Sequence, residues 1–113
     1  MNHPDFIQKT LTRDGGRIVY WHNQRPDKPA LMLLHGAGMD HHLFEQQWPA
    51  FNADHHVIVW DARGHGLSRP SFGRLGLARW VQDVLAVLDD LARPQAVLVG
   101  QSLGGLIAQK TAY

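Results

Sequence analysis

The chain has 113 residues, 44% of them hydrophobic and 19% charged, which suits one domain with a modest core. A net charge of +1 without a basic block makes nucleic acid and anionic membrane unexpected partners. The absence of cysteine excludes a disulfide framework, a thiolate nucleophile and cysteine-ligated zinc. No apolar run approaches the roughly 18 residues of a membrane span, and the N-terminus lacks signal-peptide character. We therefore expect a soluble, cytoplasmic protein.

The first third of the chain predicts three strands. Residues 6–12 and 17–22 flank Asp14-Gly15-Gly16, which supplies the positive-φ positions of a tight hairpin. Residues 23–29 are polar, contain two prolines and predict a loop. Residues 30–34 are apolar without alternation, which is typical of a strand covered on both faces in a parallel sheet.

Strands and helices alternate after this point. Asp40 can cap a short helix that carries Leu43, Phe44, Trp48 and Phe51. Residues 77–91 repeat apolar side chains every three or four positions, which predicts a longer helix that ends before Pro94. Residues 57–60 and 96–99 predict two further buried strands. The order indicates one α/β domain over residues 1–113, with an antiparallel hairpin leading into a mostly parallel sheet.

The segment Gly100-Gln101-Ser102-Leu103-Gly104 joins the last apolar run to a stretch compatible with a helix. A serine between two glycines at such a junction is typical of a nucleophile elbow, in which a sharp turn exposes the hydroxyl. Gly100 and Gly104 would let the strand and helix approach closely. The backbone N–H of Leu103 would point toward an oxyanion. The pentapeptide alone also fits a serine that merely caps a buried helix.

A second turn follows the third predicted strand. His35-Gly36-Ala37-Gly38 can present another backbone N–H to an oxyanion, that of Ala37, although a plain glycine-rich turn is the alternative. Residues 61–68 follow the fourth strand and read as a rigid loop, more structural than catalytic.

These segments, in this order and spacing, resemble the N-terminal half of the α/β-hydrolase fold family. The motifs are Leu34-His35-Gly36, residues 61–68 and residues 97–105. The resemblance implies a sheet in the order 1-2-4-3-5 with helices on both faces, and strands 6–8 beyond the fifth. It also implies a serine hydrolase that forms an acyl-enzyme on Ser102 from an ester or related carbonyl substrate, without a cofactor. Haloalkane dehalogenases and epoxide hydrolases resemble this family but carry aspartate at the elbow.

The family places its acid and histidine after the serine, and this chain has no Asp, Glu or His beyond Ser102. We therefore expect a partial domain with little turnover on its own; a non-catalytic binding or scaffold protein is the alternative. Residues 96–99 would then form an exposed sheet edge, prone to self-association.

The eight histidines all precede Ser102. The resemblance assigns His35 and His65 to structural roles in turns rather than to the catalytic base. The pairs His41-His42 and His55-His56 are expected to be solvated loop residues, because adjacent histidines point apart and rarely chelate one metal ion. No metal site is expected.

Overall fold

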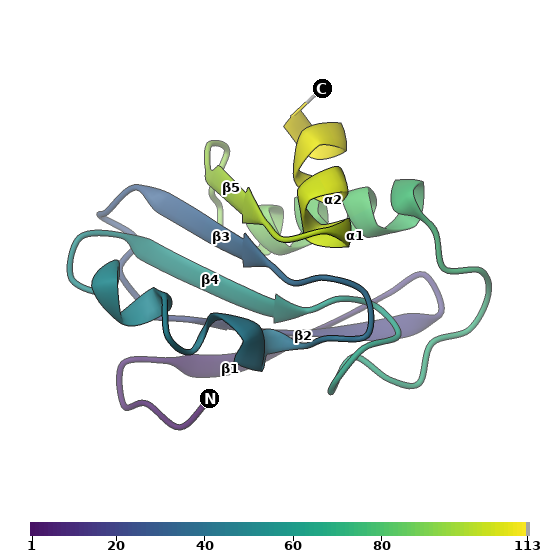
Figure 1. The fold of residues 1–113 in the computed structure, drawn as a ribbon, viewed down its shortest axis with the longest axis horizontal. Coiled ribbons are helices and arrows are strands. Elements are labelled where there is room, and N and C mark those ends of the chain that lie inside the picture. The colour runs from purple at the N-terminus through teal and green to yellow at the C-terminus, as the bar shows by residue number, and fades with distance from the viewer. Residues whose placement is uncertain (113) are drawn as a thin grey trace.

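A computed structural model describes residues 1–112 as a five-stranded sheet in the order β1-β2-β4-β3-β5 (Figure 1). Strand β2 pairs antiparallel with β1 and β4, whereas β3 runs parallel to β4 and β5. The predicted fold class and strand order are therefore confirmed. The strands are β1 (Ile7–Arg13), β2 (Gly16–His22), β3 (Ala30–Leu34), β4 (His56–Asp61) and β5 (Val97–Gly100).

The hairpin between β1 and β2 is tight, as predicted, and its turn has two residues, because Gly16 already belongs to β2. Asp14 and Gly15 adopt φ angles of 48° and 80°, and Arg13 pairs with Gly16 across the turn. Positive φ at both central positions gives a turn whose twist matches the strands, and aspartate and glycine tolerate it best.

Both α-helices lie on the same face of the sheet, α1 (Leu77–Asp90) beside α2 (Leu103–Ala112) (Figure 1). The predicted apolar stripe of α1 is buried against alternate residues of the strands, because side chains alternate between the two faces of a strand. Ile107 brings α2 into the same core. Within residues 1–112 no helix has the length and apolarity needed to cross a membrane.

The opposite face is covered by two 3-10 helices, η1 (His41–Phe44) and η2 (Trp48–Ala50), and by Phe6 near the N-terminus. Asp40 caps η1 as predicted, since its side chain accepts from the N–H of His42. The single short helix that we predicted is split in two, because Pro49 has no N–H and its ring would clash inside a continuous helix. Helical segments still cover both faces.

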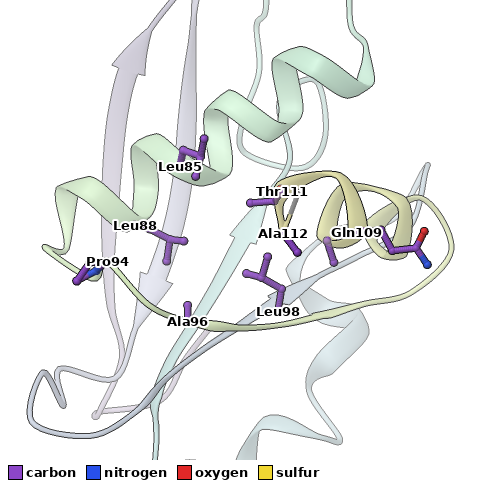
Figure 2. A pocket seen from close by; sticks show the side chains of 9 residues that line it. Leu85, Leu88, Pro94, Ala96, Leu98, Gln109, Thr111 and Ala112 are labelled. Atoms are coloured by element: carbon purple, nitrogen blue, oxygen red, sulfur yellow. The ribbon is translucent and has the colours of Figure 1, made fainter.

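Strand β5 forms one edge of the sheet, as predicted. Its side chains are unusually exposed for valines, 58% at Val97 and 42% at Val99. Beside this edge, α1, α2 and β5 enclose an open groove of about 430 Å³ (Figure 2). Its lining is mostly apolar: Leu85, Leu88, Pro94, Ala96, Leu98, Ala108, Gln109, Thr111 and Ala112.

Candidate active site

Ser102 lies at the sharp turn between β5 and α2 and is exposed. Its φ of 56° is in the left-handed region, which non-glycine residues adopt at an energetic cost of about 1–3 kcal/mol. A capping serine has an extended backbone, and its hydroxyl accepts from the next helical turn. The positive φ of Ser102 differs from that extended backbone, so the helix-cap alternative does not fit.

Two glycines make this turn sterically possible. A Cβ on Gly100 would lie 2.1 Å from the carbonyl oxygen of Gly104. A Cβ on Gly104 would lie 2.0 Å from the carbonyl oxygen of Leu34, the last residue of β3. The start of α2 is therefore pressed against the ends of β5 and β3, which brings Ser102 to the carboxyl edge of the sheet, where α/β proteins place their ligands.

The turn that follows β3 lies beside Ser102. A Cβ on Gly36 would be 3.4 Å from Cβ of Ser102 and 2.5 Å from the side-chain oxygen of Gln101. Within residues 1–112, the turn and loop hydrogen bonds include none from the backbone N–H of Ala37 or Leu103 to a backbone carbonyl. Free N–H groups on two adjoining turns are the donors that an oxyanion requires.

The buried side chain of His35 makes hydrogen bonds that stabilise this turn. It is buried, its Nδ1 lies 2.8 Å from the carbonyl oxygen of Gly36, and its Nε2 accepts from the N–H of Ala62 at 2.9 Å. Because an amide only donates, Nδ1 must carry the ring proton. Burial lowers the pKa of His35 and keeps the ring neutral. Both ring nitrogens are engaged, which agrees with a structural role and not with a base.

The loop over residues 61–68 is held as rigidly as its composition suggested. Arg63 is fully buried, and its guanidinium makes two hydrogen bonds with Asp83, at 2.8 and 2.9 Å. The hydroxyl of Ser68 donates to the carbonyl of Asp61 and accepts from the N–H of Val19 at 2.8 Å. Nδ1 of His65 lies 3.2 Å from the carbonyl oxygen of Arg63, again a contact to loop backbone.

The interpretation of the histidine pairs as solvated is wrong for two of the four residues. His41 is buried, with Nδ1 2.8 Å from a carboxylate oxygen of Asp61. His56 is buried at the first position of β4, with Nε2 2.8 Å from Nδ1 of His22 on β2. Pairing between distant strands and loops decides these environments, and the local sequence does not show it.

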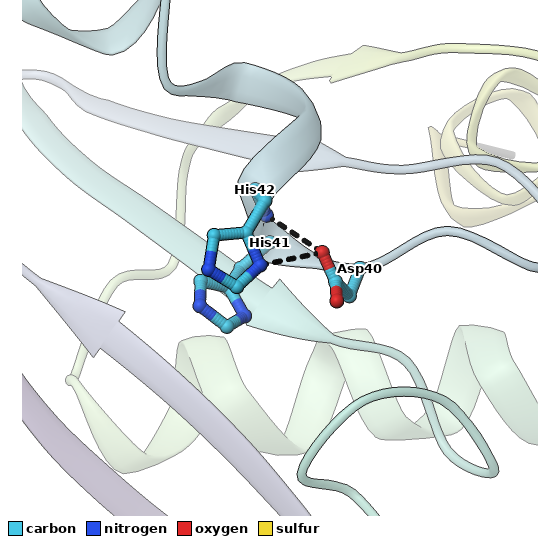
Figure 3. A group of neighbouring side chains, drawn as sticks. All are labelled: Asp40, His41 and His42. Carbon is cyan, nitrogen blue, oxygen red and sulfur yellow. Dashed lines mark hydrogen bonds and ion pairs between the residues drawn. The ribbon is translucent and has the colours of Figure 1, made fainter.

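Asp40, His41 and His42 bring three potential metal-ligand atoms within 4.8 Å of one another (Figure 3). Their hydrogen bonds already explain the cluster. Asp40 accepts from the N–H of His42 and from its ring, both at 2.9 Å, and thereby caps η1. Nδ1 of His41 is held by Asp61. We therefore assign this cluster to helix capping.

The sequence placed Asp61 in a structural loop but did not indicate the hydrogen bonds that its side chain makes. Its carboxylate is fully buried and accepts from the N–H and ring of His41 and from the N–H of Leu67. Burial alone would raise the pKa of Asp61, but these hydrogen bonds hold it below its usual value. A charged residue that ends a wholly buried strand was the available signal, because such a charge needs partners.

Comparison with known proteins matches residues 31–113 to the model of the alpha/beta hydrolase family. A 3-oxoadipate enol-lactonase of Acinetobacter baylyi is 36% identical over 103 residues, which cover 91% of this chain and 39% of the lactonase.

Two solved structures share the fold closely. A hydrolase from Pseudomonas aeruginosa has a TM-score of 0.86 at 38% identity, over 93% of this chain and 40% of that one. A putative epoxide hydrolase from Pseudomonas aeruginosa has a TM-score of 0.87 at 25% identity, over 96% of this chain and 37% of that one. The chain thus spans about two fifths of the length of these relatives.

Proposed function

Because the chain belongs to the alpha/beta hydrolase family, we propose that it supplies the nucleophile and oxyanion hole of a serine hydrolase. The observation that carries the proposal is the backbone of Ser102, held at positive φ on an exposed turn beside Gly36. A strained backbone has no evident value in a loop that is merely structural. In a nucleophile elbow, the same strained turn exposes the serine hydroxyl to substrate.

In the proposed mechanism, Oγ of Ser102 attacks the carbonyl carbon of a bound ester or lactone. The N–H groups of Ala37 and Leu103 stabilise the negative oxygen of the tetrahedral intermediate. A histidine from the remainder of the domain takes the serine proton and delivers it to the leaving alcohol, which leaves an acyl group on Ser102. Water then attacks the acyl-enzyme and releases the acid, and the serine recovers its proton.

The substrate class rests on two observations. A serine nucleophile forms an acyl-enzyme with carbonyl substrates, and a similar protein is named as an enol-lactonase. The epoxide hydrolase named among the structural relatives shares 25% identity. Because serine stands at the elbow here, we propose an ester or lactone rather than an epoxide as the substrate.

A chimera tests the proposal. Residues 1–112 are joined to the C-terminal remainder of the Acinetobacter baylyi enol-lactonase, which by the family order of serine, acid and histidine should supply the acid and the base. We expect a fluorophosphonate probe to label Ser102 and p-nitrophenyl acetate to be hydrolysed. Ser102→Ala should abolish both signals, and Ser71→Ala, remote from the elbow, should leave them unchanged. The 113-residue chain alone should hydrolyse no more ester than its own Ser102→Ala variant.

The alternative is a binding or scaffold protein, because one fold can serve unrelated functions. A folded chimera that neither reacts with the probe nor hydrolyses the ester supports this alternative and contradicts the hydrolase.

A further inference from the structure

We propose that Asp61 is a positioning residue, which places the amide of Ala37 by clamping residues 35–41, here called the oxyanion turn. This inference rests on the proposed function, because it concerns the geometry of the same oxyanion hole. Asp61, at the end of β4, would thus influence catalysis without contacting the substrate.

The C-terminal end of the oxyanion turn is bound to Asp61. One carboxylate oxygen accepts from the backbone N–H of His41 at 2.7 Å and lies 2.8 Å from Nδ1 of its ring. The other oxygen accepts from the N–H of Leu67 at 2.8 Å. Hydrogen bonds to a buried carboxylate are short and strong, so this end of the turn has little freedom.

The N-terminal end of the same turn is bound to the next residue along the chain. The N–H of Ala62 donates to Nε2 of His35, and Nδ1 of His35 donates to the carbonyl of Gly36. Two consecutive residues at the end of β4 therefore hold both ends of the oxyanion turn. Among the turn and loop hydrogen bonds of residues 1–112, none runs from the N–H of Ala37, between these ends, to a backbone carbonyl.

The middle of the oxyanion turn is restrained more lightly than its ends. The N–H of Met39 donates to the carbonyl of Gly36 at 3.2 Å, and a Cβ on Gly38 would meet nothing within 4 Å. By contrast, a Cβ on Gly66 would lie 2.3 Å from the carboxylate of Asp61, which shows how closely residues 61–68 cover it. The ring of His41 also packs on Trp21, with centroids 4.0 Å apart. Asp61 and His41 are therefore closely packed, whereas the oxyanion turn that they hold borders open space at Gly38.

Asp61→Asn tests the clamp with a side chain of the same shape. Its amide keeps one acceptor oxygen but turns an NH₂ group toward the N–H of either His41 or Leu67, so at least one of the hydrogen bonds to this side chain is lost. In both orientations the negative charge that strengthens the remaining bonds is removed. In the chimera we expect kcat for p-nitrophenyl acetate to fall about tenfold or more, toward the loss typical of a displaced oxyanion donor. KM should change less than twofold, because the clamp touches no substrate.

Asn23→Ala is the matched control. Asn23 is also buried and bonded to backbone at β4, but at the opposite end, through the N–H of Val57 and the carbonyl of His55. Its loss should lower the melting temperature without lowering kcat. In the 113-residue chain, Asp61→Asn should speed amide exchange at His41 and shift the Ala37 amide resonance, and Asn23→Ala should do neither.

The outcomes separate the two proposals. If the unchanged chimera shows no Ser102-dependent reaction, the proposed function and this inference both fail. If the chimera is active and Asp61→Asn retains its kcat, only the clamp is overturned. The clamp is overturned as well if Asn23→Ala loses as much kcat as Asp61→Asn for an equal loss of melting temperature.

Discussion

Asp83, on α1, is fully buried, and its carboxylate accepts two hydrogen bonds from the guanidinium of Arg63. Arg13 donates to it as well. Asp83→Ala would leave the Arg63 charge without its partner in a site that excludes water. We expect the free energy of unfolding in urea to fall by about 3–5 kcal/mol. Asp89→Ala, on the exposed side of the same helix, should change it by less than about 0.5 kcal/mol.

His22 and His56 give the fold a dependence on pH. Burial, followed by the charges of His22 and Arg93, lowers the pKa of His56 to about 4. Burial, followed by the charge of Lys9, lowers the pKa of His22, and Asp90 opposes that shift. At neutral pH both rings are therefore uncharged in the folded protein. In the unfolded chain, where burial no longer lowers their pKa values, they take up protons more readily.

The sign of the pH effect follows from these shifts. The stability that the neutral pair contributes is complete above about pH 6.5 and is lost as the pH falls toward 4. For His56 alone the loss approaches about 3 kcal/mol. His56→Gln should flatten the dependence of unfolding free energy on pH between 7 and 4, whereas the exposed His42→Gln should not. An unchanged slope in His56→Gln would contradict this account.

At the scale of elements, the joint between β5 and α2 depends on Gly104. A Cβ there would lie 2.0 Å from the backbone oxygen of Leu34, so either α2 or β3 must move. We expect Gly104→Ala to reduce the unfolding free energy by about 3 kcal/mol and to abolish probe labelling in the chimera.

Gly105→Ala is the control at the adjacent position. Its Cβ would lie 3.5 Å from the nearest atom, an ordinary contact, and it sits inside a helix. It should stabilise the protein by about 0.5–1 kcal/mol, because alanine loses less backbone entropy in a helix than glycine does. Equal effects of the two alanines on thermal unfolding would refute the steric account of the joint.

At the scale of the whole molecule, the edge of the sheet formed by β5 is exposed. Strand β5 has a neighbour on one side only, exposes Val97 and Val99, and borders the apolar groove of Figure 2. We propose that copies of the isolated chain associate through this edge, since unpaired strands and apolar surface favour pairing. Sedimentation velocity should show oligomers whose proportion rises with concentration.

A double substitution tests which surface is responsible. Val97→Lys with Val99→Lys should shift the sedimenting species toward monomer, because lysine on an edge strand opposes pairing. Phe72→Lys removes a side chain that is 69% exposed but lies away from β5, and it should not reduce association. Monomeric behaviour of the unchanged chain at all concentrations would rule the interaction out.

The sequence alone determined the five strands, the two α-helices and their order, but not the division of the short helix after Asp40. Its apolar runs, its helical stripe and the Asp14-Gly15 turn report local preferences, and each appears in the structure within one or two residues. The family motifs supplied the strand order and pointed to Ser102, Gly36 and Ala37. These signals are readable because each depends on residues that are neighbours along the chain.

Only the tertiary structure decided which polar groups meet. Asp61 with His41, Arg63 with Asp83, and His22 with His56 each join residues at least 20 positions apart. No periodicity records such pairs, because the free energy of burying a polar or charged group depends on partners that only folding brings within reach. The close packing of Gly104 against the end of β3, beside the left-handed backbone of Ser102, likewise joins segments that are distant in the sequence.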